Sequence, residues 1–229
     1  EDMDGHFRHN SLFVGGSTKK AVNEGRGDFT PTFFFEVPKL FKKELPVDVA
    51  LIQVSRPDEH GFVSLGISVD YTKSAVENAK VVIAQVNKYM PRTMGESFVH
   101  ISEIDCFVEF DEPLYELPKP KIGEIEKKIG KYCASLIEDG DTLQLGIGAI
   151  PDAVLSFLTN KKDLGIHSEM FADGVVDLVR KGVITNRKKS INKGKMVAAF
   201  LMGTRDLYDF VDDNPEVLMM PVDYVNNPV

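Results

Sequence analysis

The feature that most constrains the fold is a regular alternation of short apolar runs and amphipathic segments in the second half of the chain. Each apolar run has the length of one buried strand, and each segment between two runs has the spacing of a short helix. Strands joined through helices run parallel, so this order predicts an open parallel sheet covered by helices. The expected strands are 142–145, 164–167, 195–202 and 217–222, and the expected helices are 151–158, 174–181 and 206–211.

A shorter succession of the same kind occupies the first half. Residues 47–54 and 81–86 are almost continuously aliphatic, as in strands that are buried on both faces of a parallel sheet. A loop rich in turn-forming residues and an expected helix at 71–80 separate these two runs. The fold class predicted for the whole chain is therefore α/β, with two open and mainly parallel sheet domains covered by helices.

Prolines mark the boundary between the two domains. Pro113, Pro118 and Pro120 fall within ten residues, which favours an extended, semi-rigid connection. We predict an N-terminal α/β domain at 1–112, a proline-rich linker at 113–121 and a C-terminal α/β domain at 122–229. The second domain should open with a helix whose apolar side chains face the core: Ile122, Ile125, Ile129, Tyr132, Cys133, Leu136 and Ile137.

Charge and composition argue against several classes of partner. A net charge of −8 is unsuited to a nucleic-acid surface, and the longest apolar runs are too short to span a bilayer. The five histidines lack metal-ligand spacing, so no metal site is expected. Both cysteines, Cys106 and Cys133, sit in apolar patterns typical of buried thiols. The basic cluster 187–189 is expected to be a solvated loop, and the protein to be cytoplasmic.

A glycine-rich turn follows the first expected strand of the second domain. Gly146, Ile147, Gly148, Ala149 and Ile150 lie between that strand and the next helix. Glycine lets a ligand approach backbone N–H groups, and the start of a helix adds a partial positive charge. The turn is therefore a candidate site for an anion or a developing oxyanion, although a glycine turn that only reverses the chain explains the pattern equally well. The third glycine of a dinucleotide fingerprint is missing.

A carboxylate, Glu169, comes directly after the expected strand 164–167. Carboxyl ends of parallel strands meet at one edge of a sheet, where ligands of open α/β folds bind. Glu169 should therefore lie beside the glycine turn. A single glutamate in a loop is more often a solvated surface group, and His167 has an ordinary explanation as a strand residue packed into the core. The neighbouring turn is what favours a functional Glu169.

Five motifs, in order, resemble the acetyl-CoA hydrolase/transferase family. They cover nearly the whole chain, and they are similar in particular to the family's 4-hydroxybutyrate and butyryl-CoA:acetate CoA-transferases. The motifs are VSRPDEHGFVSLG at 54–66, NKYMPRTMG at 87–95, LQLGIGAIPDAV at 143–154, LGIHSEMFADGV at 164–175 and DYVNNP at 223–228.

The resemblance implies an activity and a role for each candidate residue. Glu169 would be the nucleophile that forms a glutamyl thioester with coenzyme A. The turn 146–150 would contact coenzyme A, with the N–H of Ile147 in an oxyanion hole, and Asn226 would stabilise the thioester. The implied reaction exchanges coenzyme A between short-chain carboxylic acids with ping-pong kinetics, in a homo-oligomer and without a metal.

Residues 87–95 are expected to supply part of the acid pocket, with Met90 and Met94 as apolar walls, although ordinary loop or core roles fit them as well. Family members begin upstream of Glu1 and continue past Val229 to a second glycine-rich motif, GGxxDF, which this sequence lacks. We therefore expect a chain truncated at both ends.

Two alternatives to a transferase stay open. One is an acyl-CoA hydrolase that uses the same Glu169, and the other is a non-catalytic piece that binds coenzyme A or another subunit. A dehydrogenase is disfavoured, because no acidic ribose partner follows the glycine turn at the expected spacing.

Overall fold

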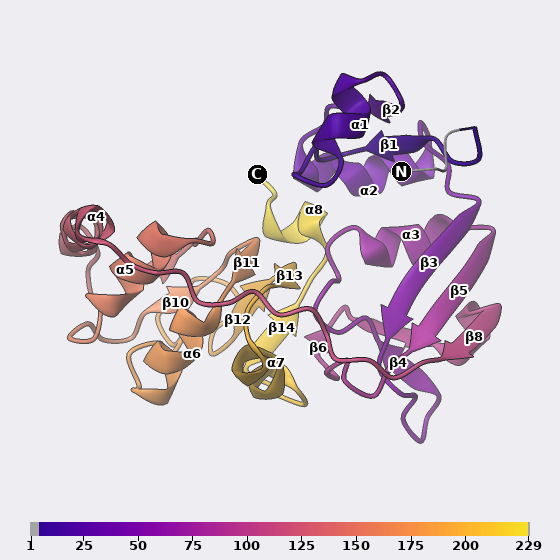
Figure 1. Cartoon of the computed structure of the whole chain (residues 1–229). Coiled ribbons are helices and arrows are strands. Elements are labelled where there is room, and N and C mark those ends of the chain that lie inside the picture. Colours follow the sequence, from indigo (N-terminus) through magenta and orange to yellow (C-terminus); the bar gives the residue numbers. More distant parts are fainter. Residues whose placement is uncertain (1–4, 229) are drawn as a thin grey trace.

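The computed structural model describes residues 5–228 and confirms a mixed α/β fold in which most strand pairs are parallel. The first half of the chain forms the lobe on the right of Figure 1, and the elements from α4 onward extend to the left. The elements of the first half are β1 (His9–Ser11), α1 (Lys19–Asn23), β2 (Gly27–Phe29), η1 (Phe34–Glu36), α2 (Val37–Lys42), β3 (Val49–Val54), β4 (Phe62–Ser64), α3 (Thr72–Asn78), β5 (Val81–Val86), β6 (Met94–Gly95), β7 (Phe98–His100), η2 (Ile101–Glu103) and β8 (Cys106–Glu109).

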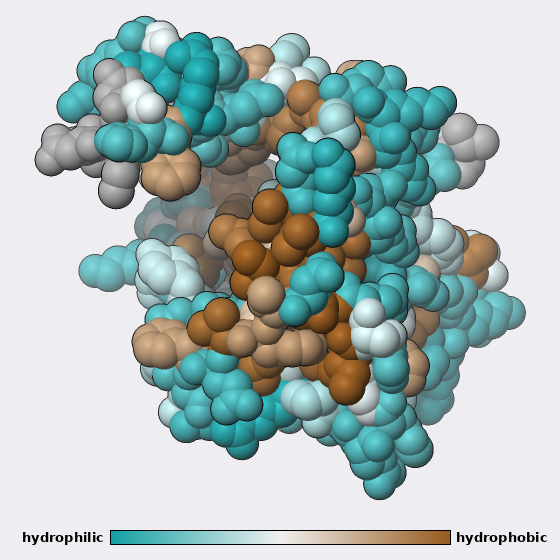
Figure 2. All heavy atoms as spheres, turned by 90° about the vertical axis from the view of Figure 1, so that its right-hand side faces the viewer, coloured by the Kyte–Doolittle hydropathy of each residue, from teal (hydrophilic) through white to brown (hydrophobic). Residues whose placement is uncertain are grey.

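The sheet of this lobe is parallel, in the order β3-β5-β8. The strands predicted at 47–54 and 81–86 and the helix predicted at 71–80 are confirmed as β3, β5 and α3. Alternate residues such as Ile52 and Ala84 are buried in the core. On the other face, Leu51 is 77% exposed and Val108 is 52% exposed. Figure 2 looks at this side of the molecule and shows apolar side chains gathered in its centre.

This open face corrects one expectation. The two aliphatic runs predicted strands buried on both faces, but the described helices cover only one face of the sheet. Cys106 is also exposed, because it lies on β8, the edge strand of this sheet. The prediction of a buried thiol at this position is therefore wrong.

The second half of the chain follows the predicted alternation. Its elements are α4 (Glu124–Ser135), β9 (Thr142–Leu143), α5 (Ala149–Ser156), β10 (Gly165–Ile166), β11 (Met170–Phe171), α6 (Asp173–Arg180), β12 (Met196–Ala198), β13 (Phe200–Leu201), α7 (Arg205–Val211), β14 (Val217–Met219) and α8 (Val222–Val225). The predicted strand 195–202 is divided into β12 and β13, with Ala199 between them. The strand predicted at 217–222 ends at Met219, so that α8 can begin at Val222.

Parallel pairing builds the sheet that carries the candidate site. β9 pairs with β10, and β12 pairs with β14. A parallel bridge between His167 and Val197 joins these two pairs. The resulting order is β9-β10-β12-β14, and the carboxyl ends of all four strands lie at one edge.

A strand from the first half completes this sheet. β6 pairs in parallel with β14, so that Gly95 lies opposite Met219. Gly95 has a φ of +98°, and any side chain on it would clash with the carbonyl of Met219. Residues 113–121 cross between the two halves as extended chain without helix or strand, visible along the front of Figure 1. Our division into domains stays a prediction.

The helix after this linker packs through a different face from the one predicted. Gly130 and Ala134 are its buried residues, and a Cβ on Gly130 would lie 2.7 Å from the backbone of Ala153 in α5. Small residues are needed there because the two helix backbones approach closely. The larger apolar side chains face outward, with Tyr132 75% exposed and Leu136 81% exposed. Cys133, also predicted to be buried, is exposed.

Candidate active site

Glu169 lies at a break in the sheet, between β10 and β11. Its carbonyl oxygen accepts hydrogen bonds from the N–H groups of Ala199, at 2.9 Å, and Phe200, at 3.1 Å. Ala199 is the matching break between β12 and β13, and Phe200 is the first residue of β13. The backbone of Glu169 is thus held by the neighbouring strand, and its side chain is half-buried. The expected position at the carboxyl edge of the sheet is confirmed.

Asn226 is the direct partner of this carboxylate. Its Nδ2 donates a hydrogen bond of 2.6 Å to Oε2 of Glu169. Asn226 is the C-cap of α8, so the end of a short helix aims its amide at the sheet edge. The sequence resemblance assigned both residues to one site, and the fold brings their side chains into contact.

His167 fastens the same helix to the sheet. Its Nε2 lies 3.1 Å from the carbonyl oxygen of Val225, the last residue of α8, and donates a hydrogen bond to it. Burial lowers the pKa of His167, which favours the neutral ring. The imidazole is therefore more than a core residue, because it holds the helix end that carries Asn226.

Ser168 attaches the glycine turn to the segment that carries Glu169. Its side chain is buried, and its Oγ accepts a 2.9 Å hydrogen bond from the N–H of Leu145 and donates a 3.0 Å hydrogen bond to the carbonyl of the same residue. An isolated bridge also pairs Leu145 with Met170. Because the turn starts at Gly146, it begins directly beside the backbone of Glu169, as the sequence predicted.

The turn itself has the geometry of a donor site. Gly148 has φ +118° and ψ −177°, a conformation that is essentially restricted to glycine. The N–H groups of Gly146, Ile147 and Gly148 have no acceptor among residues 5–228. These donors are available to an anion that approaches from outside. None of the five turn residues lines the pocket around Glu169, although Gln144 just before them does.

That pocket has a volume of about 480 Å³ and is built from four separate segments. Gln144 and residues 167–169 come from the sheet edge, residues 225–228 from the end of α8, and residues 33–35 from the first half of the chain. The predicted contribution of 87–95 to this pocket is wrong. Met90 is buried in the core, and Met94 lies in β6, at the far side of β14 from Glu169.

Three consecutive phenylalanines replace the predicted methionine walls. Phe34 packs edge-to-face against Phe200, with ring centroids 6.2 Å apart, and against Tyr71, at 5.7 Å. This contact anchors η1 next to the strand break that holds Glu169. The run of three phenylalanines was the available signal, but nothing local in the sequence shows which distant surface such a run packs against.

Lys189 supports the strand β10, which precedes Glu169. The side chain is 2% exposed, and its Nζ donates to the carbonyl oxygens of Ile166, at 2.7 Å, and Lys195, at 2.6 Å. Burial lowers the pKa of Lys189 to about 8. The expected solvated loop at 187–189 is therefore wrong for this residue, since the last carbonyl of β10 requires its ammonium group.

Two further features bear on the class of site. Within residues 5–228, His, Cys, Asp and Glu side chains do not form a group of three or more that could hold a metal ion. The described helices also include none that is long and apolar enough to cross a membrane.

The arrangement agrees with a solved structure. The 4-hydroxybutyrate CoA-transferase of Porphyromonas gingivalis superimposes with a TM-score of 0.85 at 47% identity, over 99% of this chain and 59% of that one. The chain therefore has an α/β fold of the class seen in that CoA-transferase. Within that class, the sequence model of the acetyl-CoA hydrolase/transferase N-terminal domain matches residues 1–116. The chain belongs to the acetyl-CoA hydrolase/transferase family, as its motifs predicted.

Curated relatives agree with this assignment. A 4-hydroxybutyrate coenzyme A transferase of Clostridium kluyveri is 66% identical over 100% of this chain and 54% of its own length. A succinyl-CoA:acetate/propanoyl-CoA:succinate CoA transferase of Fasciola hepatica is 52% identical over 100% of this chain and 48% of its own length. The chain thus spans about half the length of the curated relatives it matches.

Proposed function

We propose that this chain carries the nucleophile of a CoA-transferase that exchanges coenzyme A between short-chain aliphatic carboxylic acids. The observation that carries the proposal is the 2.6 Å hydrogen bond between Asn226 and Glu169 inside a pocket of about 480 Å³. The two relatives described above are named for acids of two to four carbons, among them acetate, succinate and 4-hydroxybutyrate. The pocket has room for acids of this size.

The chemistry proceeds through two covalent intermediates. One carboxylate oxygen of Glu169 attacks the thioester carbonyl of an acyl-CoA, which gives a mixed anhydride and releases the CoA thiolate. The thiolate then attacks the glutamyl carbonyl, which forms glutamyl-CoA and releases the first acid. A second acid reverses both steps and leaves as the new acyl-CoA, while Glu169 is regenerated. Covalent catalysis of this kind conserves the thioester and gives ping-pong kinetics.

Neighbouring groups act on charge and orientation. A glutamate side chain is ordinarily ionised at pH 7, so the nucleophile needs no partner base. The Asn226 amide orients one oxygen of Glu169 and leaves the other to attack. The free N–H groups of the turn at Ile147 are suited to the oxyanion of the tetrahedral intermediate, and one such donor lowers a barrier by roughly 2.7–4 kcal/mol in other acyl-transfer sites. Contacts with coenzyme A far from the reacting carbon hold the thiol in place.

The test uses a protein of the relatives' full length that contains these 229 residues, called here the full-length protein. It is mixed with butyryl-CoA, quenched and measured by intact mass. A CoA-sized adduct on the peptide that holds Glu169 is expected, and Glu169→Gln should abolish both the adduct and the exchange of coenzyme A. Glu216→Gln, at an exposed position before β14, is the matched control.

Two results would contradict the proposal. Exchange by Glu169→Gln at more than about a hundredth of the normal rate would exclude an essential nucleophile, because a factor of 100 corresponds to only about 2.7 kcal/mol. Release of free acid that acetate fails to suppress would identify a hydrolase instead. Homo-oligomeric assembly stays a prediction from the family resemblance, and a cytoplasmic location stays a prediction from composition.

A further inference from the structure

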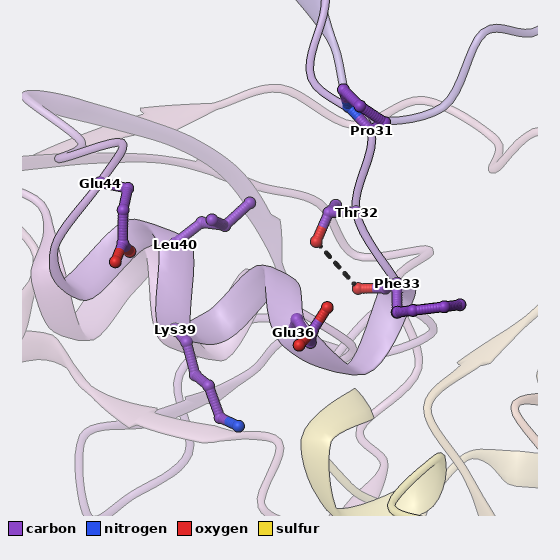
Figure 3. A pocket seen from close by; sticks show the side chains of 7 residues that line it. All are labelled: Pro31, Thr32, Phe33, Glu36, Lys39, Leu40 and Glu44. Atoms are coloured by element: carbon purple, nitrogen blue, oxygen red, sulfur yellow. Dashed lines mark hydrogen bonds between the residues drawn. The ribbon is translucent and has the colours of Figure 1, made fainter.

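The pocket around Glu169 shares one residue with a second pocket. That second pocket has a volume of about 640 Å³ and lies between the segment before η1 and the helix α2. Phe33 lines both pockets. The other residues around the second pocket are Pro31, Thr32, Glu36, Lys39, Leu40 and Glu44, all drawn in Figure 3.

Phe33 has an exposed ring, and neighbouring contacts hold its backbone in place. Its neighbour Phe34 is anchored against Phe200, and Oγ1 of Thr32 donates a 3.2 Å hydrogen bond to the carbonyl of Phe33, drawn as a dashed line in Figure 3. The Phe33 ring is 72% exposed and, among the described rings, stacks only on Phe35, with ring centroids 6.0 Å apart. In Figure 3 it projects away from the side chains of α2. Removing the ring therefore costs little core packing.

We propose that Phe33 determines specificity by ending the acyl pocket, and that the second pocket receives the aliphatic chain of longer acids once the ring is removed or displaced. This inference rests on the proposed function, because it needs the reacting carboxyl group of the substrate at Glu169. From there, the chain of the acid extends among the apolar residues of the pocket, of which the rings of 33–35 are the aromatic part. A chain that extends from Glu169 toward the first half of the protein meets Phe33 before it reaches the second pocket.

The charges around the second pocket determine which chemical group the far end of the substrate acid can carry. Glu36 and Glu44 bring two carboxylates, and Lys39 brings one ammonium group, whose Nζ lies 6.0 Å from the Phe35 ring. The apolar surface of Leu40 and Pro31 suits methylene groups. Two carboxylates against one ammonium repel a second carboxylate at the far end of a substrate. The class of ligand is therefore a neutral medium-chain monocarboxylic acid, not a dicarboxylic acid of the same length.

The experiment measures CoA transfer by the full-length protein from butyryl-CoA to acetate, hexanoate and adipate. Phe33→Ala should raise the hexanoate-to-acetate ratio of kcat/KM by at least about tenfold, the lower range for one methylene in an apolar pocket. The adipate-to-acetate ratio should stay unchanged, and Phe33→Leu should give an intermediate hexanoate ratio. Phe13→Ala, an 84% exposed phenylalanine that lines neither pocket, should match the wild type.

Each outcome separates the inference from the function on which it rests. If the wild type transfers coenzyme A and Phe33→Ala leaves the hexanoate ratio unchanged, Phe33 does not limit the pocket, although the proposed function stands. Equal gains for hexanoate and adipate would refute the selection by charge. Failure of the folded wild type to transfer coenzyme A to acetate would contradict the proposed function itself.

Discussion

The hydrogen bond between Asn226 and Glu169 permits a test in which the activity of one variant, relative to the wild type, depends on pH. In Asn226→Asp, a carboxylate oxygen replaces the Nδ2 that lies 2.6 Å from Oε2 of Glu169, with almost no change in shape. Two ionised carboxylates at 2.6 Å repel by about 6 kcal/mol at an effective dielectric constant near 20. The pair therefore keeps one proton, and its upper pKa is raised above the ordinary carboxylate range.

The sign of the effect follows from where that proton lies. Below the raised pKa, the introduced carboxyl group is protonated and donates to Glu169 as the amide did. Above it, both groups are charged, and the nucleophile loses its donor. The activity of Asn226→Asp relative to the wild type should thus fall as the pH rises from about 5 to about 8. Asn226→Ala only removes a hydrogen bond to a charged group, worth about 1.5–3 kcal/mol, so it should lose about 10- to 150-fold at every pH.

The assay is initial-rate kcat/KM for butyryl-CoA and acetate across that pH range, with the full-length protein and both variants. Asn160→Asp is the matched control, because it adds the same charge at an exposed position that does not line the pocket around Glu169. A constant ratio of Asn226→Asp to wild type at all pH values would refute the reasoning. It would mean that the two side chains do not share a proton.

Two further substitutions test the turn and the buried lysine. Gly148→Ala strains a backbone at φ +118° without a clash, so the affinity for coenzyme A should fall in equilibrium binding, whereas Gly182→Ala, at φ +72° and equally open, should cost stability alone. Burial lowers the pKa of Lys189 to about 8 from 10.5, so the unfolded chain holds a proton that the folded chain loses in this window. Part of the free energy of unfolding, measured in urea, should therefore increase between about pH 8 and about pH 10.5. Lys189→Met should abolish this increase. Lys127→Met, at an exposed position, should retain it.

Local pattern predicted much of the second half because each element there is defined by neighbours in the sequence. The strands at β9, β10, β12 and β14 and the helices between them follow from apolar spacing alone. Parallel order then placed Glu169 at the sheet edge beside the turn. Asn226 could be assigned only through the family resemblance, since nothing in its own surroundings indicates a contact with a residue 57 positions away.

The errors share a physical cause. The spacing of apolar residues along the sequence predicts a helix or a strand, but it does not show which other part of the protein covers each face. In α4 the contact face is set by the small residues Gly130 and Ala134, so the larger apolar stripe was assigned to the wrong side. Met90 and Met94 were expected either to wall the acid pocket or to have ordinary loop or core roles, whereas Phe33 to Phe35 line the pocket around Glu169. Those rings meet the site through tertiary packing of η1 against α8, which no local period encodes.

The pairing of β6 with β14 has a consequence for how the protein is made. During synthesis, residues 94–95 emerge long before their hydrogen-bond partners at 218–219. Until then, the backbone groups of this strand that pair with β14 have no partner. Contacts between such distant positions form late and slow the search for the native state. Meanwhile, the waiting strand and its apolar neighbours are exposed to aggregation, which chaperones limit. Asn226, whose amide donates to Glu169, emerges later still, so this contact forms only after both of those strands have been made.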